Sequence, residues 1–226
     1  MNEIEQALTS LRTRIAGWEA RYGRPEGSVR LLAVSKTKPP AVVEAAYRFG
    51  QRDFGENHLQ DAQVKLDALG DLDICWHFIG PIQSNKTRPI SAEFDWVHSI
   101  DRMKIARRLS DQRPENLPPL EVCVQVNISG EDSKSGVDPE EAPALAADVA
   151  RLPGLRLRGL MAIPRPEREF SAQREPFRRL RRLLEDLNER GLGLDTLSMG
   201  MTDDLEAAIA EGATIVRVGT AIFGPR

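Results

Sequence analysis

Cysteine and aromatic residues are scarce in this chain of 226 residues. It has two cysteines, and aromatic residues make up 5% of the sequence. Cys75 and Cys123 fall in predicted strands about 50 residues apart and form no Cys-x-x-Cys pair, so the sequence indicates neither a zinc site nor a redox motif. We expect both to be buried, reduced thiols.

The chain also lacks a basic excess and any long hydrophobic segment. Its formal net charge is −3, so neither nucleic acid nor an anionic membrane is an expected partner. No apolar run approaches the roughly 18 residues of a membrane span, and the first residues lack the basic and apolar blocks of a signal peptide. We therefore expect a cytoplasmic protein. A hydrophobic content of 41% is enough for a globular core.

Lysine is rare as well, with six lysines against 25 arginines. Lys36 ends the stretch 30–36, whose apolar and branched residues predict a strand buried on both faces, and a proline pair follows soon after it. On a period of two, Leu32 and Val34 share a face with Lys36. An amine there loses solvation, which favours the uncharged form that attacks an aldehyde to give a Schiff base. The alternative is a strand-end lysine whose stem lies on apolar surface while its amine reaches water.

Eight segments of strand character alternate with helical segments. The expected strands are 30–36, 52–57, 75–80, 96–100, 120–128, 157–163, 196–201 and 214–223. An amphipathic helix is expected before them at about 2–22. The alternation predicts an α/β fold, a closed (β/α)8 TIM barrel that forms a single domain over 1–226. The first unit has no Gly-x-Gly-x-x-Gly, which disfavours a dinucleotide-binding sheet.

The carboxyl ends of these strands form the candidate site, because barrels of this kind place their chemistry there and hold phosphate after strands seven and eight. The ends present Lys36, Asn57, Gly80, Asp101, Asn127, Met161 with Ala162, Ser198 with Gly200, and Gly219 with Thr220. The last two pairs combine a hydroxyl with glycine, which lets backbone amides approach an anion. They indicate a phosphate site, or else the glycines only allow tight strand exits.

Arg217 interrupts the apolar run of the last strand. Val216 and Val218 share one face, so Arg217 points to the other, into the barrel, where a guanidinium needs an acceptor. That acceptor is either a structural carboxylate or a ring nitrogen or carboxylate of a ligand near Lys36.

The three histidines, His58, His77 and His98, are not at metal-ligand spacings. We expect His77 to be an inner-wall residue rather than a base, and we expect no metal site. Lys134, in the loop after the fifth strand, is expected to be solvated; the alternative is that it transiently captures a ligand at the mouth of the barrel.

Motifs along almost the whole chain resemble those of the pyridoxal 5′-phosphate (PLP) homeostasis proteins. The matching stretches are 33–39, 54–57, 76–86, 127–129, 133–136, 158–163, 197–201 and 216–224. The resemblance implies a barrel like the alanine racemase N-terminal domain, which is fold-type III among PLP proteins. This sequence departs from the family pattern at His58, where members usually have tyrosine. It also ends at Arg226, whereas members commonly extend further, which suggests that a short final helix is missing.

The resemblance also implies roles for individual residues. Lys36 would carry the cofactor as an internal aldimine, and Arg217 would face the pyridine nitrogen. Ser198, Gly219 and Thr220 would lie at the phosphate, and Asn57 completes the expected set of cofactor-binding residues. No catalytic residue is expected.

Binding without turnover is the function that these residues favour. An always-protonated arginine leaves the pyridine nitrogen unprotonated and weakens the ring as an electron sink. Racemases with that arrangement add a tyrosine from a further domain of a partner subunit, whereas Tyr22 and Tyr47, the only tyrosines here, fall on predicted outer helices. We expect a monomeric, non-catalytic carrier or buffer that passes PLP to apo forms of PLP-dependent enzymes. The alternatives are a weak PLP-dependent amino-acid racemase and a cofactor-free barrel enzyme that uses Lys36 on sugar phosphates.

Overall fold

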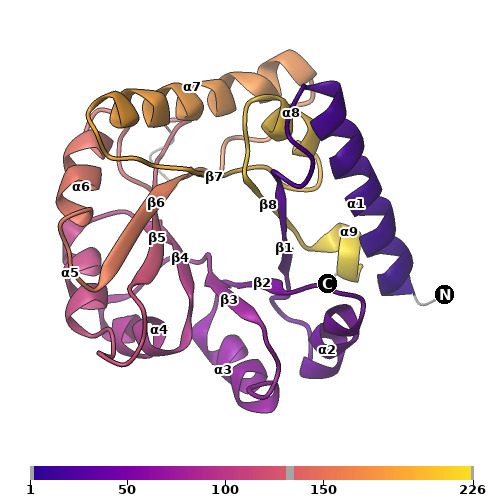
Figure 1. The fold of residues 1–226 in the computed structure, drawn as a ribbon, viewed down its shortest axis with the longest axis horizontal. Coiled ribbons are helices and arrows are strands. Elements are labelled where there is room, and N and C mark those ends of the chain that lie inside the picture. Colours follow the sequence, from indigo (N-terminus) through magenta and orange to yellow (C-terminus); the bar gives the residue numbers. More distant parts are fainter. Residues whose placement is uncertain (1–2, 131–134, 225–226) are drawn as a thin grey trace.

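Eight parallel strands close into a ring in the computed structural model, which describes residues 3–130 and 135–224 (Figure 1). The strands are β1 (Arg30–Val34), β2 (Asp53–Glu56), β3 (Cys75–Phe78), β4 (Trp96–Ile100), β5 (Leu120–Gln125), β6 (Leu155–Met161), β7 (Thr196–Ser198) and β8 (Ile215–Val218). Each strand pairs with the next, and β8 pairs with β1 through Leu32 and Arg217 among others. The predicted (β/α)8 barrel is confirmed.

The helices lie outside the ring of strands (Figure 1). They are α1 (Glu3–Arg21), α2 (Pro40–Arg48), α3 (Leu59–Ala68), α4 (Thr87–Glu93) after a 3₁₀ turn (Ser84–Lys86), α5 (Met103–Asp111), α6 (Ala142–Val149), α7 (Phe170–Glu189), α8 (Leu205–Ala210) and α9 (Thr220–Phe223). Leu8, Leu11 and Ile15 form the buried face of α1, as the sequence period predicts, and α1 packs against α8, α9 and α2. None of the helices in the described ranges is long and apolar enough to cross a membrane.

Two apolar layers follow from the alternation of side chains along the strands. Outward-facing residues such as Val216 and Val218 join the large core between the strands and the helices. Inward-facing residues such as Leu32, Trp96 and Ile215 form a smaller cluster inside the ring. Polar side chains complete the interior, and the expected inward position of Arg217 is observed.

Seven of the eight predicted strands end earlier than expected, and β1 and β8 show two different causes. β1 stops at Val34, because residues 35–38 form a turn in which Thr37 has a φ of +66°. β8 stops at Val218, and residues 220–223, predicted as strand, form α9 instead. A short apolar run fits a strand or a buried helical turn equally well. Here Ile222 of α9 packs into the outer core.

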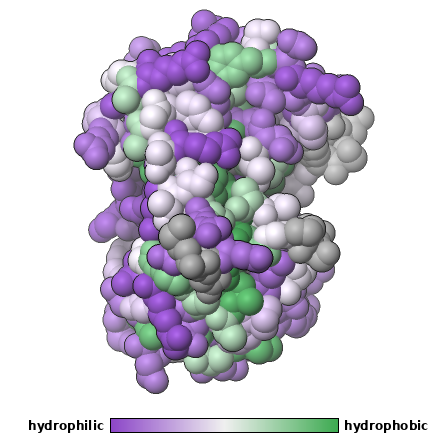
Figure 2. Space-filling view, turned by 90° about the vertical axis from the view of Figure 1, so that its right-hand side faces the viewer, coloured by the Kyte–Doolittle hydropathy of each residue, from purple (hydrophilic) through white to green (hydrophobic). Residues whose placement is uncertain are grey.

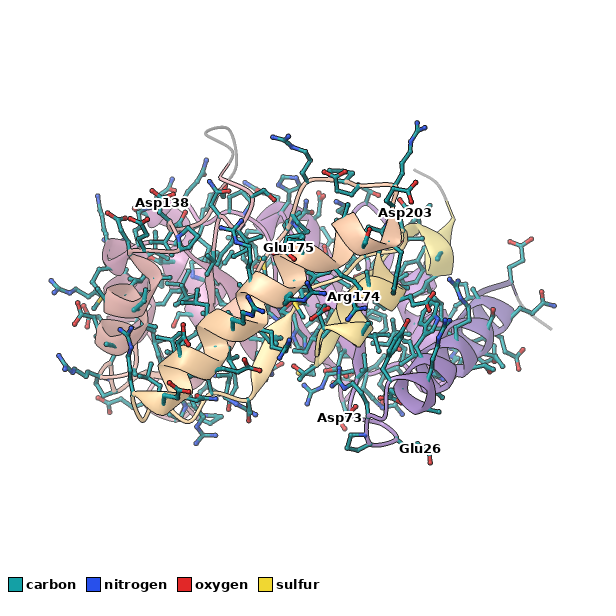
Figure 3. All side chains as sticks on the ribbon, turned by 90° about the horizontal axis from the view of Figure 1, so that it is seen from above. Glu26, Asp73, Asp138, Arg174, Glu175 and Asp203 are labelled. Atoms are coloured by element: carbon teal, nitrogen blue, oxygen red, sulfur yellow. The ribbon has the colours of Figure 1, made fainter. Side chains whose placement is uncertain are left out.

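The two ends of the barrel can be told apart in Figure 3. Glu26 and Asp73, which precede β1 and β3, lie at the amino end, and Asp138 and Asp203, which follow β5 and β7, lie at the opposite end. The outer face that includes α1 is mostly hydrophilic, with hydrophobic residues in smaller groups (Figure 2). The carboxyl end is the end at which the sequence predicts the site.

Candidate functional site

A cavity of about 330 Å³ lies at the carboxyl end of the barrel, a size that suits a small ligand. It is bounded by the ends of β1 and β8 and by the loops after β2, β3, β6 and β7. Five of the six predicted cofactor-binding residues line it, namely Lys36, Asn57, Arg217, Gly219 and Thr220. The structure thus brings together residues that lie as far apart in the sequence as the first and last strands.

The lining of this cavity is positively charged. Lys36, Lys38 and Arg217 contribute three basic side chains, and the described residues of the lining include no carboxylate. Two of its residues, Ile163 and Met201, are exposed hydrophobic side chains. The cavity therefore suits an anionic ligand that also has an apolar surface.

The position of Lys36 is set by the turn that follows β1. The Ser35 amide donates to the Gly55 carbonyl oxygen at 3.0 Å, and the Lys38 amide donates to the Ser35 carbonyl oxygen at 3.0 Å. Thr37 adopts a left-handed conformation that costs free energy in a residue with a branched side chain. The turn places the half-buried Lys36 at the cavity.

A buried ion pair supports this turn from below. Glu56, at the end of β2, accepts hydrogen bonds at Oε1 from the Ser35 hydroxyl and from Lys65 Nζ, the latter at 2.7 Å. The side chains of Lys65 and Glu56 are 2% and 0% exposed. Burial raises the pKa of Glu56, although the Lys65 and Ser35 hydrogen bonds act to lower it. Sequence reasoning missed Lys65, because a lysine on an amphipathic helix is ordinarily solvated.

Arg217 is held inside the barrel by two acceptors. Its Nη1 donates to Ser198 Oγ at 2.8 Å and its Nη2 donates to the Ala162 carbonyl oxygen at 2.8 Å. Arg217 is in none of the ion pairs found among the described residues. The structural carboxylate that the sequence allowed as its acceptor is therefore not among its partners there. Burial lowers the pKa of Arg217 to about 10, which still leaves it protonated at neutral pH.

Ser198 does not line the cavity, unlike the other predicted ligands. It is fully buried, and its Oγ lies between Arg217 Nη1 and His98 Nδ1, at 2.8 Å and 2.7 Å. Its hydroxyl is therefore placed to hold Arg217. A contact between Ser198 and a phosphate stays a sequence-based prediction.

Two cavity residues were missed by sequence reasoning. Thr202, in the loop after β7, lines the cavity with a hydroxyl. Lys38 also lines it and donates from Nζ to the Phe223 carbonyl oxygen at 2.9 Å, whereas the sequence gave no reason to separate it from a solvated lysine. The signal for Thr202 was its place just beyond Gly200, whose φ is +95°.

Asn57 and Gly80 meet at one edge of the cavity. A Cβ on Gly80 would lie 2.1 Å from the Asn57 carbonyl oxygen, so this close approach requires glycine. Asn57 Oδ1 is buried and has no hydrogen-bond partner among the described residues. An unsatisfied buried acceptor beside a cavity indicates a missing donor, such as one from a ligand.

The remaining candidates lie elsewhere. His58 lines a neighbouring cavity of about 490 Å³ that shares Asn57 with the first one. Lys134 lies outside the described residues. Tyr22 donates to Glu206 at 2.9 Å on the outer helices, and Tyr47 stacks on Arg52, so neither tyrosine lines the cavity.

Lys65→Met should destabilise the protein by about 3 kcal/mol, because it leaves the buried Glu56 carboxyl without its ionic partner. The free energy of unfolding is measured by urea denaturation. The control is the double variant Lys65→Met with Glu56→Gln, which removes both charges and should recover most of the loss. Equal losses in the single and double variants would contradict this role of the pair.

Comparisons with known proteins agree on the family. Residues 7–226 match the family model for the alanine racemase, N-terminal domain. The pyridoxal phosphate homeostasis protein of Pseudomonas aeruginosa is 62% identical over 100% of this chain and 97% of that protein. The protein of the same name in Escherichia coli strain K12 is 52% identical over 100% of this chain and 98% of its own length.

Two solved structures are also similar to this chain. PipY of Synechococcus elongatus with PLP bound is 37% identical, with a TM-score of 0.85 over 98% of this chain and 100% of that chain. Alanine racemase of Corynebacterium glutamicum, at 17% identity, has a TM-score of 0.73 over 99% of this chain and 61% of its own, which shows a shared fold. This chain therefore belongs to the family of the pyridoxal phosphate homeostasis proteins, built on the alanine racemase N-terminal domain.

Proposed function

We propose that this chain binds PLP covalently through Lys36 and serves PLP homeostasis by buffering the cofactor and delivering it. The observation that carries the proposal is the cavity at the carboxyl end, where Lys36 meets Arg217, Gly219 and Thr220 without a carboxylate in the lining. The PLP-bound PipY structure supports the choice of ligand over a sugar phosphate.

The residues of the cavity fit the chemical groups of PLP one by one. Thr202, Gly219 and Thr220 would hold the phosphate, since α9 begins at Thr220 and the first amides of a helix have no intrahelical acceptor. The cationic lining would balance its negative charge. The unpartnered Oδ1 of Asn57 would accept a hydrogen bond from the ligand. When bound, the cofactor supplies an aldehyde carbon that a lysine amine attacks reversibly.

Arg217 would face the ring nitrogen of the cofactor. A guanidinium can donate hydrogen bonds but cannot accept them, so a nitrogen that meets Arg217 must be unprotonated. Ser198 and the Ala162 carbonyl fix the guanidinium from behind. This pairing orients the ring while it limits the ability of the ring to take up electrons.

A carrier fits the lining better than an enzyme does. Among the described lining residues there is no histidine, tyrosine, carboxylate or thiol that could exchange a proton with an amino acid on the face opposite Lys36. A weak racemase is the alternative, and exchange of the α-proton of an amino acid for deuterium would reveal it.

Lys36→Ala should abolish both the visible absorbance of protein mixed with PLP and the mass adduct that forms after borohydride reduction, because the amine is removed. The matched control is Lys38→Ala, which changes a second lysine of the same cavity and should retain both signals. Retention of the adduct in Lys36→Ala, with its loss in Lys38→Ala, would move the assignment to Lys38.

The recipients would be apo forms of PLP-dependent enzymes in the cytoplasm, with the carrier acting as a monomer. We expect loaded protein to activate an apo-enzyme even when a PLP-trapping competitor is present, because handover does not release free aldehyde. The comparison is an equal amount of free PLP, which the competitor should intercept. Equal inhibition of both reactions would limit the function to buffering.

A further inference from the structure

A row of polar side chains crosses the barrel interior and ends at Arg217. It begins at Asp53, at the amino end of β2, and continues through His77 on β3, His98 on β4 and Ser198 on β7. The links are 3.1 Å from His77 Nε2 to Asp53 Oδ1, 2.9 Å from His77 Nδ1 to His98 Nε2, 2.7 Å from His98 Nδ1 to Ser198 Oγ, and 2.8 Å from Ser198 Oγ to Arg217 Nη1. The row joins the amino end of the barrel to the ligand cavity.

Arg217 determines the direction of these hydrogen bonds, because a guanidinium only donates. Ser198 Oγ accepts from Arg217, and its only other hydrogen-bond partner among the described residues is His98 Nδ1, so its own proton goes there. His98 must then carry its proton on Nε2 and donate to His77 Nδ1, and His77 must donate from Nε2 to Asp53. An ionised carboxylate can only accept hydrogen bonds, so Asp53 also requires that His77 Nε2 donates to it. Both ends of the row therefore fix the same direction.

The charge states agree with this direction. Burial lowers the pKa of His98 well below its usual value, and burial likewise lowers the pKa of His77 even though Asp53 acts to raise it. Burial acts to raise the pKa of Asp53, but the hydrogen bond from His77 and the charge of Arg30 outweigh it, and the net direction is downward. Two neutral imidazoles thus connect an anion to a cation.

We propose that Asp53, His77 and His98 are positioning residues for the ligand cavity, which keep Ser198 oriented as an acceptor and so fix the guanidinium of Arg217. Hydrogen bonds aligned in one direction polarise one another in a low-dielectric interior, so the row holds Arg217 more firmly than Ser198 alone could. The proposal rests on the proposed function only for the statement that Arg217 meets the ligand; the row itself is present without one.

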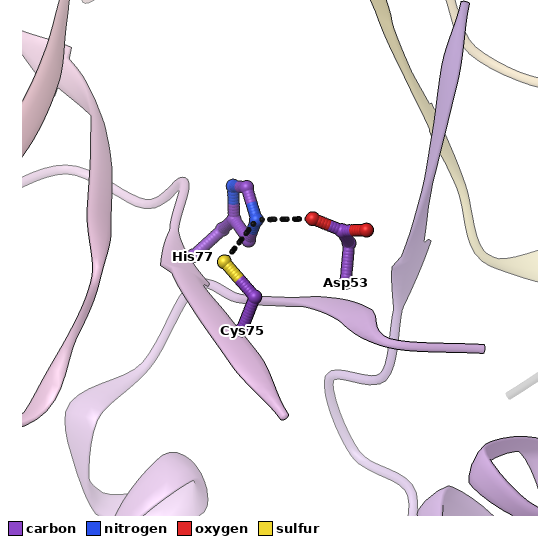
Figure 4. Close-up of side chains that lie close together, drawn as sticks. All are labelled: Asp53, Cys75 and His77. Carbon is purple, nitrogen blue, oxygen red and sulfur yellow. Dashed lines mark hydrogen bonds and ion pairs between the residues drawn. The ribbon is translucent and has the colours of Figure 1, made fainter. Parts of the chain in front are cut away.

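A metal site is the competing interpretation of the amino end of the row. Figure 4 shows Asp53, Cys75 and His77 together, and their ligand atoms all lie within 4.8 Å of one another. A metal bound by His77 would take the lone pair of Nε2, so the His77 proton would lie on Nδ1 and the hydrogen bonds of the row would run in the opposite direction. His98 and Arg217 would then both donate to Ser198 Oγ. Burial also raises the pKa of the Cys75 thiol, and Arg30 lies 3.3 Å from Asp53 Oδ1. The geometry therefore favours the hydrogen-bonded row.

The direct test is ¹⁵N NMR of the imidazole rings in the protein without PLP. The chain has three histidines, and the exposed His58 serves as an internal reference. At neutral pH we expect His77 and His98 both to be neutral with the proton on Nε2. A charged ring, a proton on Nδ1 of either residue, or a shift of the His77 signals on addition of Zn²⁺ would overturn the proposal, whatever the outcome of PLP binding.

Variants test whether the row acts on the cavity. Asp53→Ala should shift the His98 ¹⁵N signals and weaken PLP binding by about three- to tenfold, the scale of one lost hydrogen bond. Asp53→Asn should rescue binding, because its amide oxygen can still accept from His77. The matched control is Asp95→Ala, which removes a carboxylate that binds the Trp76 amide at the same end, outside the row.

The variants separate the two proposals. Equal effects of Asp53→Ala and Asp95→Ala on PLP affinity, or no effect of Asp53→Ala on affinity and on the His98 signals, would overturn the row as a positioning device. Failure of the unmodified protein to bind PLP would instead overturn the proposed function and leave the NMR result to decide the direction of the row.

Discussion

The buried ion pair of Glu56 and Lys65 is the interaction on which the ligand cavity depends. It lies beneath the turn at residues 35–38 and holds it through the Ser35 hydroxyl, in a conformation that Thr37 adopts only at a cost in free energy. The ring of strands determines the position of the end of β1, and the Glu56–Lys65 pair determines the conformation of the turn that follows it. Together they determine that the amine of Lys36 belongs to a cavity and not to the outer surface.

The basic lining of the ligand cavity and the carboxylate of Asp53 lie at opposite ends of the barrel. Cationic side chains line the cavity at the carboxyl end, and its described lining residues include no carboxylate, which prepares the cavity for an anion. Arg217 donates to the Ser198 hydroxyl and to the Ala162 carbonyl. Two neutral histidines then connect Ser198 to Asp53. A distant carboxylate can support the guanidinium without competing for the ligand, whereas an adjacent one would form a salt bridge with it.

Much of the fold could be predicted from residue patterns. The period of α1 and the alternation of β5 gave elements close to those observed, and the rule that chemistry follows barrel strands selected five residues that line one cavity. Strand ends were less accurate, because the apolar residues 220–223 fit either a strand or the short helix α9. Local composition does not decide between these without the packing around it.

The residues that sequence reasoning missed depend on contacts between distant segments. Lys65 looks solvated until Glu56, nine residues away, is seen to be buried beside it. Ser198 was predicted from its place at a strand end, but its hydrogen bonds with Arg217 and His98 could not be predicted from that place. The row from Asp53 to Arg217 joins residues of five strands, and no spacing along the chain reveals it. Such partners become visible only when the ring closes.

A crystal structure of the protein grown with PLP tests the central claim most directly. The account predicts continuous electron density between Lys36 Nζ and the cofactor, with the phosphate beside Gly219, Thr220 and Thr202 and the ring nitrogen facing Arg217. Cofactor bound in the neighbouring cavity beside His58, or cofactor in the predicted cavity without a bond to Lys36, would contradict it.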